Sequence, residues 1–356
     1  MGSLAVFPSS AEAEGLSRLG VVCSQEPRRS EHQQCPRSAL QVLGMTGVLS
    51  GYVCVVTGAS RGIGKGIALQ LSEAGATVYI TGRNKETLQQ AAHEVESRGG
   101  KCISVVCDSS EDDDIKALFE KVRREQKGRL DILVNNAYSG VETIVSTYTK
   151  PFWECPVSMW DNLNNAGLRG HYQCSVYAAR MMVEARRGLI VVISSIGGLR
   201  YLFNVPYGIG KAACDRMAAD CAVELKKHNV KYISLWPGAV LTETIKEKMA
   251  SGDTSSSEAE MLTSIIKFGE SPELSGKCIV SLATDPNLMN YSGKVLMNFD
   301  LARRYGIQDV NGRPITNYTS LRFVLSTVPS LAWLARFIPG FICIPKWVLT
   351  LSASKF

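Results

Sequence analysis

The chain has 356 residues, of which 45% are hydrophobic and 20% are charged, and its formal net charge is +6. This composition is that of an ordinary globular protein, and no run of Lys and Arg interleaves with aromatic residues, so we expect no nucleic-acid binding. The sequence has no CxxC pair and its four histidines lack ligand spacing, which predicts a reducing compartment and no bound metal.

The first 44 residues are rich in Ser, Glu, Arg, Gln and Pro and show no sustained hydrophobic period. Such a composition cannot bury enough apolar surface to fold, so we expect a disordered N-terminal extension over residues 1–44. No apolar block follows a basic start, so no secretory signal is predicted.

From Tyr52 onward, short apolar runs alternate with longer helical patterns. Strands separated by helices predict an α/β fold with a doubly wound, parallel, seven-stranded sheet of the Rossmann type and helices on both faces. We expect one domain over residues 45–320. The predicted strands are 53–56, 77–81, 102–107, 132–134, 189–193, 232–235 and 294–297, and the predicted helices are 63–74, 85–98, 112–126, 160–185, 207–228 and 274–284.

Two insertions follow predicted strands at the edge where such a sheet binds ligands. Residues 138–158 follow the fourth strand and are expected to line the cleft. Residues 241–271 follow the sixth strand and carry two candidate helices around the polar run 251–257, so we expect them to form a substrate lid.

The last segment, 321–356, is an apolar tail, and within its hydrophobic stretch 323–351 three prolines and two cations, Arg336 and Lys346, interrupt the run. A spanning helix needs about 20 unbroken apolar residues, so an interfacial membrane anchor with Trp333 and Trp347 at the headgroups is favoured. The alternative is an arm packed on a partner subunit.

A glycine-rich turn follows the first strand. Gly58 suits a tight turn, Gly62 allows close approach of a phosphate, and Gly64 allows contact between helix and strand. The helix that begins near Ile63 directs its amide donors at a pyrophosphate. The sequence therefore predicts a dinucleotide site.

No carboxylate ends the second strand, where an NAD enzyme binds the ribose 2′-hydroxyl. Arg83 follows that strand and Arg61 lies in the glycine loop, and guanidinium groups bind phosphate through paired donors. The pair favours NADPH over NADH as cofactor.

Tyr207 and Lys211 lie one helical turn apart and share a face. A neighbouring ammonium stabilises phenolate, so we expect Lys211 to lower the pKa of Tyr207 and Tyr207 to donate a proton to a substrate carbonyl. Ser195 ends the fifth strand and could hydrogen-bond the substrate oxygen. Ser195, Tyr207 and Lys211 are the predicted catalytic residues, and the first two are expected to contact the substrate.

The loop Thr57–Gly64, the run Asn135-Asn136-Ala137 and the pair Tyr207 and Lys211 resemble the short-chain dehydrogenase/reductase family over about Ser50 to Asp300. The family's spacing back from Tyr207 indicates Ser194, whereas the Ser-Ser-x-x-Gly motif indicates Ser195, which we prefer.

The resemblance implies that Asp108 holds the adenine, that Asn135 lies near the adenosine ribose, that Lys211 binds the nicotinamide ribose and that Thr242 binds the nicotinamide amide. It also implies a homo-oligomer formed through the helices around 160–185 and 207–228. The full expected cofactor-binding set is Gly58, Ser60, Arg61, Gly62, Ile63, Gly64, Arg83, Asp108, Asn135, Tyr207, Lys211, Pro237, Gly238, Val240 and Thr242.

Two positions depart from the family pattern. Gly167 stands where family members carry an asparagine that relays protons to the lysine, and Tyr138 replaces the glycine that follows Asn-Asn-Ala. Asn164, one turn earlier, is expected either to substitute for the relay through a water or to have a structural role. These changes put the rate in question more than the reaction type.

The sequence therefore predicts an NADPH-dependent carbonyl reductase acting on lipophilic ketones or aldehydes such as steroids or xenobiotics. We expect it at the endoplasmic reticulum membrane, with the cytoplasm as the second choice. The alternative function is a weakly catalytic or non-catalytic cofactor-binding scaffold at a membrane, which Gly167 motivates.

Overall fold

The computed structural model describes residues 47–147, 150–251, 263, 268–326 and 329–353. The chain divides into a larger unit, Thr46–Thr316 with Ala353–Phe356, and a smaller one, Met1–Met45 with Asn317–Ser352. The predicted N-terminal extension, residues 1–44, lies outside the described residues.

The larger unit contains one seven-stranded sheet in the order β3-β2-β1-β4-β5-β6-β7, and every strand pair is parallel. This confirms the predicted fold. The central strands β1 and β4 are buried along their whole length, as expected for strands covered on both faces. The strands are β1 Val53–Val56, β2 Thr77–Gly82, β3 Lys101–Val106, β4 Ile132–Asn135, β5 Gly188–Ile193, β6 Val230–Trp236 and β7 Val295–Met297.

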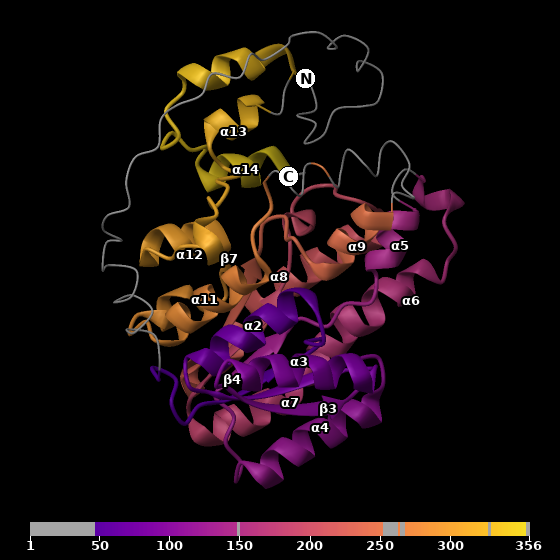
Figure 1. Cartoon of the computed structure of the whole chain (residues 1–356), viewed down its shortest axis with the longest axis vertical. Helices are drawn as coiled ribbons and strands as arrows, with labels where there is room; N and C mark the ends of the chain where they lie inside the picture. Colours follow the sequence, from indigo (N-terminus) through magenta and orange to yellow (C-terminus); the bar gives the residue numbers. More distant parts are fainter. Residues whose placement is uncertain (1–46, 148–149, 252–262, 264–267, 327–328, 354–356) are drawn as a thin grey trace, which may run out of the picture. The chain divides into compact units, whose positions relative to one another are not determined.

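Helices cover both faces of the sheet (Figure 1). On one face, α11 (Pro272–Ala283) packs against α2 (Gly62–Glu73), which also contacts α3 (Lys85–Ser97). On the other, α7 (Gly170–Ala185) contacts both α4 (Asp112–Glu125) and α8 (Val205–Leu225). Sequence periodicity explains this placement, because the buried residues of α4 recur at helical spacing on one side: Ile115, Leu118, Phe119 and Val122.

The single helix predicted over 160–185 is wrong, because the structure divides it into three parts. These are α6 (Met159–Asn164), a π-helical segment η2 (Asn165–Arg169) and α7. At the start of α7, a Cβ added to Gly170 would lie 2.0 Å from the Ser109 carbonyl oxygen. Short π-helical segments such as η2 reorient the residues around them and often occur at functional sites.

The two insertions are partly described. The first contains α5 (Val141–Ser146) and the short helix η1 (Phe152–Glu154), and the second begins with α9 (Glu243–Ser251). The second helix expected in the lid falls largely outside the described residues. The remaining elements of this unit are η3 Ile196–Gly198, η4 Lys226–His228, η5 Leu288–Tyr291, α12 Asn298–Tyr305 and η6 Val310–Gly312.

The smaller unit, as described, contains α13 (Leu321–Ser326), η7 (Pro329–Phe337) and α14 (Lys346–Ala353). An antiparallel bridge between Ser320 and Cys343 joins the residue before α13 to the segment before α14. No helix in the described part of the chain is both long enough and apolar enough to cross a membrane.

Candidate active site

The glycine-rich turn between β1 and α2 packs closely against the loop after β4 and is hydrogen-bonded to it. Gly58 has φ +62°, and a Cβ on it would lie 2.6 Å from the Ala137 Cα. Asn136 Nδ2 donates to the carbonyl oxygens of Thr57 and Gly58, at 2.9 Å each, and a Cβ on Gly64 would meet that amide at 2.4 Å. Asn136 and Thr57, which the sequence analysis placed in motifs without giving them a role, are therefore structural partners of the turn.

The N-terminus of α2 holds an anion from elsewhere in the chain. Arg61 at the N-cap makes no capping hydrogen bond, and the backbone N–H of Gly62 donates to Glu243 Oε2 at 2.7 Å. Lys65 Nζ lies 2.7 Å from Glu243 Oε1. This carboxylate stands in for a phosphate, so the residues present fit the pyrophosphate of a dinucleotide. Ile63 and Ser60 are half-buried beside this end of the helix.

The two candidate residues for a 2′-phosphate, Arg61 and Arg83, are both exposed, and neither forms an ion pair with a described carboxylate. Asp108 is half-buried, and its Oδ1 accepts hydrogen bonds from the backbone N–H of Ser110 at 2.9 Å and its hydroxyl at 2.7 Å. Asp108 thus forms a turn after β3, and an adenine contact stays a prediction.

Asn135 lies differently from what the resemblance implies. Its side chain is completely buried, and Nδ2 donates to Ser175 Oγ on α7 at 2.8 Å. In this arrangement the side chain is not open to a ribose, because the pleat of β4 turns it into the helix layer. A cofactor contact from Asn135 would have to come from its backbone.

The loop after β6, which carries Pro237, Gly238, Val240 and Thr242, reaches the glycine turn. A Cβ on Gly62 would lie 3.3 Å from the Thr242 methyl group. Glu270, which the sequence analysis missed, supports this loop. Its backbone pairs with Val240 in a parallel bridge, and its carboxylate accepts a hydrogen bond from the Gly238 N–H.

Glu270 is 3% exposed, and burial raises the pKa of its carboxyl to about 8 although Asn298 and Gly238 donate hydrogen bonds to it. Its backbone also bonds Ala239 and Leu241, at 2.8 and 3.0 Å. No local motif marks this glutamate, because its role depends on a long-range contact.

Ser195, Tyr207 and Lys211 come together at the end of β5 and the start of α8. The Ser195 hydroxyl accepts from the Gly197 N–H at 3.1 Å and is hydrogen-bonded to the Tyr207 hydroxyl. Ser194 Oγ instead donates to the Lys211 carbonyl oxygen at 3.1 Å. Of the two serines, only Ser195 therefore has its hydroxyl at the phenol. Asn204 caps α8 by accepting from the Tyr207 N–H at 2.9 Å.

The expected effect of Lys211 on Tyr207 is wrong for this arrangement. Burial raises the pKa of Tyr207 to about 12, against the lowering effect of the Ser195 hydrogen bond. Lys211 is 8% exposed, and burial lowers the pKa of its ammonium. Its Nζ donates to the Ile193 carbonyl oxygen at 3.0 Å and lies 5.9 Å from the Tyr207 ring centroid, so its charge is directed at the strand end.

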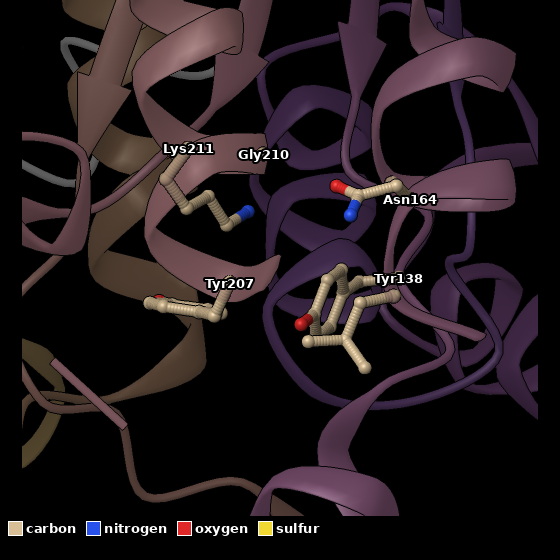
Figure 2. Close-up of a pocket in the computed structure, with 7 residues that line it drawn as sticks. Tyr138, Asn164, Tyr207, Gly210 and Lys211 are labelled. Carbon is tan, nitrogen blue, oxygen red and sulfur yellow. The ribbon is translucent and has the colours of Figure 1, made fainter. Parts of the chain in front are cut away.

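The residues that depart from the family pattern line one pocket beside this group. Figure 2 shows the Lys211 side chain extending toward Tyr138 and Asn164. Asn164 is buried, and its Nδ2 donates to the Pro206 carbonyl oxygen at 3.3 Å. This bond ties α6 to the first turn of α8 and is a structural role. The pocket is lined by Tyr138, Leu163, Asn164, Gly167, Tyr207, Gly210 and Lys211.

Aromatic side chains border the phenol of Tyr207. Phe203, in the left-handed region with φ +64°, packs edge-on against the Tyr207 ring at 5.1 Å between centroids. A non-glycine residue with this backbone conformation is uncommon and is often found at ligand sites. Tyr201 is 75% exposed nearby in the chain, and Tyr207 also packs against the cluster of Ile144, Met159 and Leu163.

No group of three or more His, Cys, Asp and Glu residues suited to a metal ion occurs among the described residues. The completely buried His171 bonds the Ala137 carbonyl oxygen through Nε2 at 2.9 Å, and burial lowers the pKa of its imidazole to about 3. It supports the loop after β4 as a neutral side chain.

Comparison with known proteins gives consistent matches. A family model described as short chain dehydrogenase matches residues 52–252. The dehydrogenase/reductase SDR family member 1 of Mus musculus is 62% identical over 313 residues, covering 88% of this chain and 100% of its own length.

Two solved structures have a similar fold. A 7α-hydroxysteroid dehydrogenase complexed with NADH and 7-oxo glycochenodeoxycholic acid has TM-score 0.60 and 27% identity, over 70% of this chain and 93% of its own. A structure from Beutenbergia cavernae with bound NADP at low occupancy has TM-score 0.60 and 28% identity, over 70% of this chain and 96% of its own.

Proposed function

Because the chain belongs to the short-chain dehydrogenase/reductase family and is an NAD(P)-dependent oxidoreductase by that membership, we propose that it reduces lipophilic ketones or aldehydes with NADPH. The observation that carries the proposal is the hydrogen-bonded pair of Ser195 and Tyr207 beside the buried Lys211. Steroids and xenobiotic carbonyls are the proposed substrate class.

The chemistry follows from these three side chains. With a pKa raised to about 12, Tyr207 keeps its proton at neutral pH and can donate it to a carbonyl oxygen. The Ser195 hydroxyl, already bonded to the phenol, is in position to hydrogen-bond the same oxygen as negative charge develops there. Lys211, whose ammonium is directed at the Ile193 carbonyl and not at the phenol, is assigned to the nicotinamide ribose, as the family resemblance implies. When bound, the nicotinamide supplies the hydride.

The preference for NADPH rests on Arg61 and Arg83. Both guanidinium groups are exposed at the ends of neighbouring segments, and no described carboxylate competes for them. A 2′-phosphate would pair with them bidentately, whereas a ribose hydroxyl offers them no charge. NADH is the less favoured cofactor.

The lipophilic substrate class rests on the aromatic surface around Tyr207. Phe203 borders the phenol, and the segment before it exposes Tyr201. Residues 141–153, 199–203 and 241–249 are the proposed lining of the substrate site. The 7α-hydroxysteroid dehydrogenase of similar fold binds a steroid acid, which is consistent with this class.

We further propose that the smaller unit associates with the endoplasmic reticulum membrane. Trp333 is 57% exposed, Trp347 65% and Phe341 73%, which is a large apolar surface for so short a segment. The exposed Tyr172 and Val223 on α7 and α8 support a homo-oligomer through these helices.

The deciding experiment measures NADPH and NADH binding to the purified full chain by fluorescence and then NADPH oxidation with a panel of lipophilic ketones. We expect tighter NADPH binding and ketone-dependent oxidation. Tyr207→Phe removes the proton donor, so it is expected to abolish turnover and retain NADPH binding. Binding without turnover across the panel would favour the alternative, a non-catalytic cofactor-binding scaffold.

A further inference from the structure

The two departures at Tyr138 and Gly167 are in direct contact. A Cβ added to Gly167 would lie 2.7 Å from Tyr138 Cδ2 and 3.1 Å from Cε2. Real Cβ atoms essentially never approach a neighbour this closely, so residue 167 cannot carry a side chain while the ring is in place. The glycine and the tyrosine are therefore two halves of one packing arrangement.

The same ring lies close to the Lys211 ammonium. Lys211 Nζ is 4.9 Å from the Tyr138 ring centroid, closer than the 5.9 Å to the Tyr207 ring. A cation within about 6 Å of an aromatic face is attracted by the negative face of the ring, and the attraction grows when water is excluded. Lys211 is 8% exposed, and the Ile193 carbonyl at 3.0 Å accepts only one of its three N–H groups.

The hydroxyl of Tyr138 has no part in this contact. Its Oη is buried without a hydrogen-bond partner among the described residues, and a Cβ on Gly140 would lie 2.7 Å from it. Burial raises the pKa of this phenol far above its usual range, so it stays neutral. The ring and not the hydroxyl is what Tyr138 brings to the site.

We propose that Tyr138 is a positioning residue whose ring holds the Lys211 ammonium in the active site, and that residue 167 is glycine because this ring occupies the space above it. The proposal rests on the carbonyl reductase function for its kinetic consequences, and its packing half stands without that function. The Tyr138 ring thus contacts Lys211 and also fills the space that a side chain at position 167 would need.

The other charged and titratable groups around Lys211 leave this role to the ring. On α8, Asp215 favours the ammonium, but its carboxylate is bound by Ser234 and by Trp236, at 2.6 and 2.9 Å. The remaining neighbours are Tyr207 and Cys214 on α8, Tyr138 after β4 and the neutral His171 on α7.

The first test compares Tyr138→Phe with Tyr138→Leu in the full chain. Phenylalanine keeps the ring face, whereas leucine keeps apolar volume and loses the face. We expect the kcat of Tyr138→Phe to lie within about twofold of the wild type and the kcat of Tyr138→Leu to be about tenfold lower, equivalent to about 1.4 kcal/mol. Losing the ring is also expected to lower the pKa of the Lys211 ammonium, so the alkaline limb of the pH–rate profile of Tyr138→Leu should move to lower pH.

NADPH binding is followed by fluorescence on the same variants, because the family places Lys211 on the nicotinamide ribose. We expect Tyr138→Leu to bind NADPH more weakly than the wild type and Tyr138→Phe to bind it equally well. Two results overturn the positioning role of the ring. One is a Tyr138→Leu variant equal to the wild type in pH–rate profile and NADPH binding. The other is a Tyr138→Phe variant as impaired as Tyr138→Leu, which would assign the role to the hydroxyl.

The second test measures packing by thermal unfolding in a double-mutant cycle. Gly167→Ala is expected to lower Tm markedly in the presence of Tyr138 and to have little effect in a Tyr138→Gly background, where the ring is gone. Equal losses of Tm in both backgrounds would disprove the steric link.

The tests separate the two proposals. A wild type that oxidises NADPH with ketones, together with an unaffected Tyr138→Leu variant, would refute the positioning role and leave the reductase function standing. A wild type without turnover would refute the reductase function, while the binding comparison and the Tm cycle still decide on Tyr138.

Discussion

The carboxylate of Glu243 accepts a hydrogen bond from the backbone N–H of Gly62 at 2.7 Å, across 181 residues of sequence. The first residue of α9 thereby occupies the end of α2 that fits a pyrophosphate. Burial opposes ionisation of Glu243, but hydrogen bonds from Lys65 and from Gly62 hold its pKa below the usual range. A negative charge is therefore fixed where the cofactor brings its own.

Glu243→Gln is expected to tighten NADPH binding by about fivefold, because an uncharged amide no longer competes with phosphate at the helix end. Fluorescence titration at low and high salt measures this, and the gain should shrink as salt screens the charge. Glu94→Gln is the matched control, since Glu94 also pairs with Lys65, at 3.0 Å, without touching Gly62. Weaker binding of Glu243→Gln would instead mean that this carboxylate helps to retain the cofactor.

Arg83→Ala is expected to weaken NADPH binding by about tenfold or more and to leave NADH binding nearly unchanged, because only NADPH carries the 2′-phosphate. Paired titrations with both cofactors measure the ratio. Arg123→Ala serves as a control, since Arg123 is exposed and pairs with Glu184 at 3.0 Å. An equal loss for both cofactors would remove the basis for the NADPH preference.

Glu270 should make stability depend on pH. Its folded pKa of about 8 lies above the ordinary value of 4.5, so the folded state binds the proton more tightly than the unfolded state. This contribution is complete at acidic pH below the unfolded value and is lost as pH rises through about 8. Denaturant unfolding is expected to show stability falling more steeply between about pH 6 and about pH 8 in the wild type than in Glu270→Gln. Parallel curves would contradict the assignment.

Asp131, which directly precedes β4, supports the start of β1. It is 5% exposed, accepts from the Val53 N–H at 2.9 Å and pairs with Arg129 and Arg187, at 2.7 and 2.8 Å. Asp131→Asn is expected to lower the free energy of unfolding by about 2 kcal/mol, because a buried carboxylate with two half-exposed arginine partners becomes a neutral amide. The exposed Asp220, replaced by Asn in a parallel measurement, should change it little.

Trp347→Ala in the smaller unit is expected to reduce co-sedimentation of the full chain with phospholipid vesicles, because an exposed indole partitions into the headgroup region. Trp153→Ala is the matched control, since this tryptophan is 73% exposed in the larger unit, compared with 65% for Trp347. Identical sedimentation of wild type and Trp347→Ala, or an equal loss in both variants, would argue against an anchor in the smaller unit.

Much of the fold could be predicted because its signals are local. Four-residue apolar runs such as Val53–Val56, bounded by turn residues, indicate buried strands, and the predicted strand limits differ from the observed ones by only a few residues. The turn around Gly58 and the spacing of Tyr207 and Lys211 are equally local, since a helix brings residues four apart to one face.

The prediction of one helix over 160–185 was wrong because the hydrophobic period alone does not reveal a π-helical segment. The π-helical segment Asn165–Arg169 ends at Gly170, whose backbone packs against the Ser109 carbonyl on another loop, and a hydrophobic period does not report such a contact. The sequence could not predict the contacts of the Asn135 side chain or of the Glu243 and Glu270 carboxylates for the same reason, because their partners are distant in sequence.

The sequence by itself therefore determined the parallel sheet, the glycine-rich turn and the spacing of the pair Tyr207 and Lys211, because periodicity and short spacings act within a single element. Only the tertiary structure decided the electrostatics of that pair, since burial sets the pKa of Tyr207 and directs Lys211 toward Ile193. It also decided that Tyr138 covers Gly167, because that contact exists only when the segment η2 and the loop after β4 pack together.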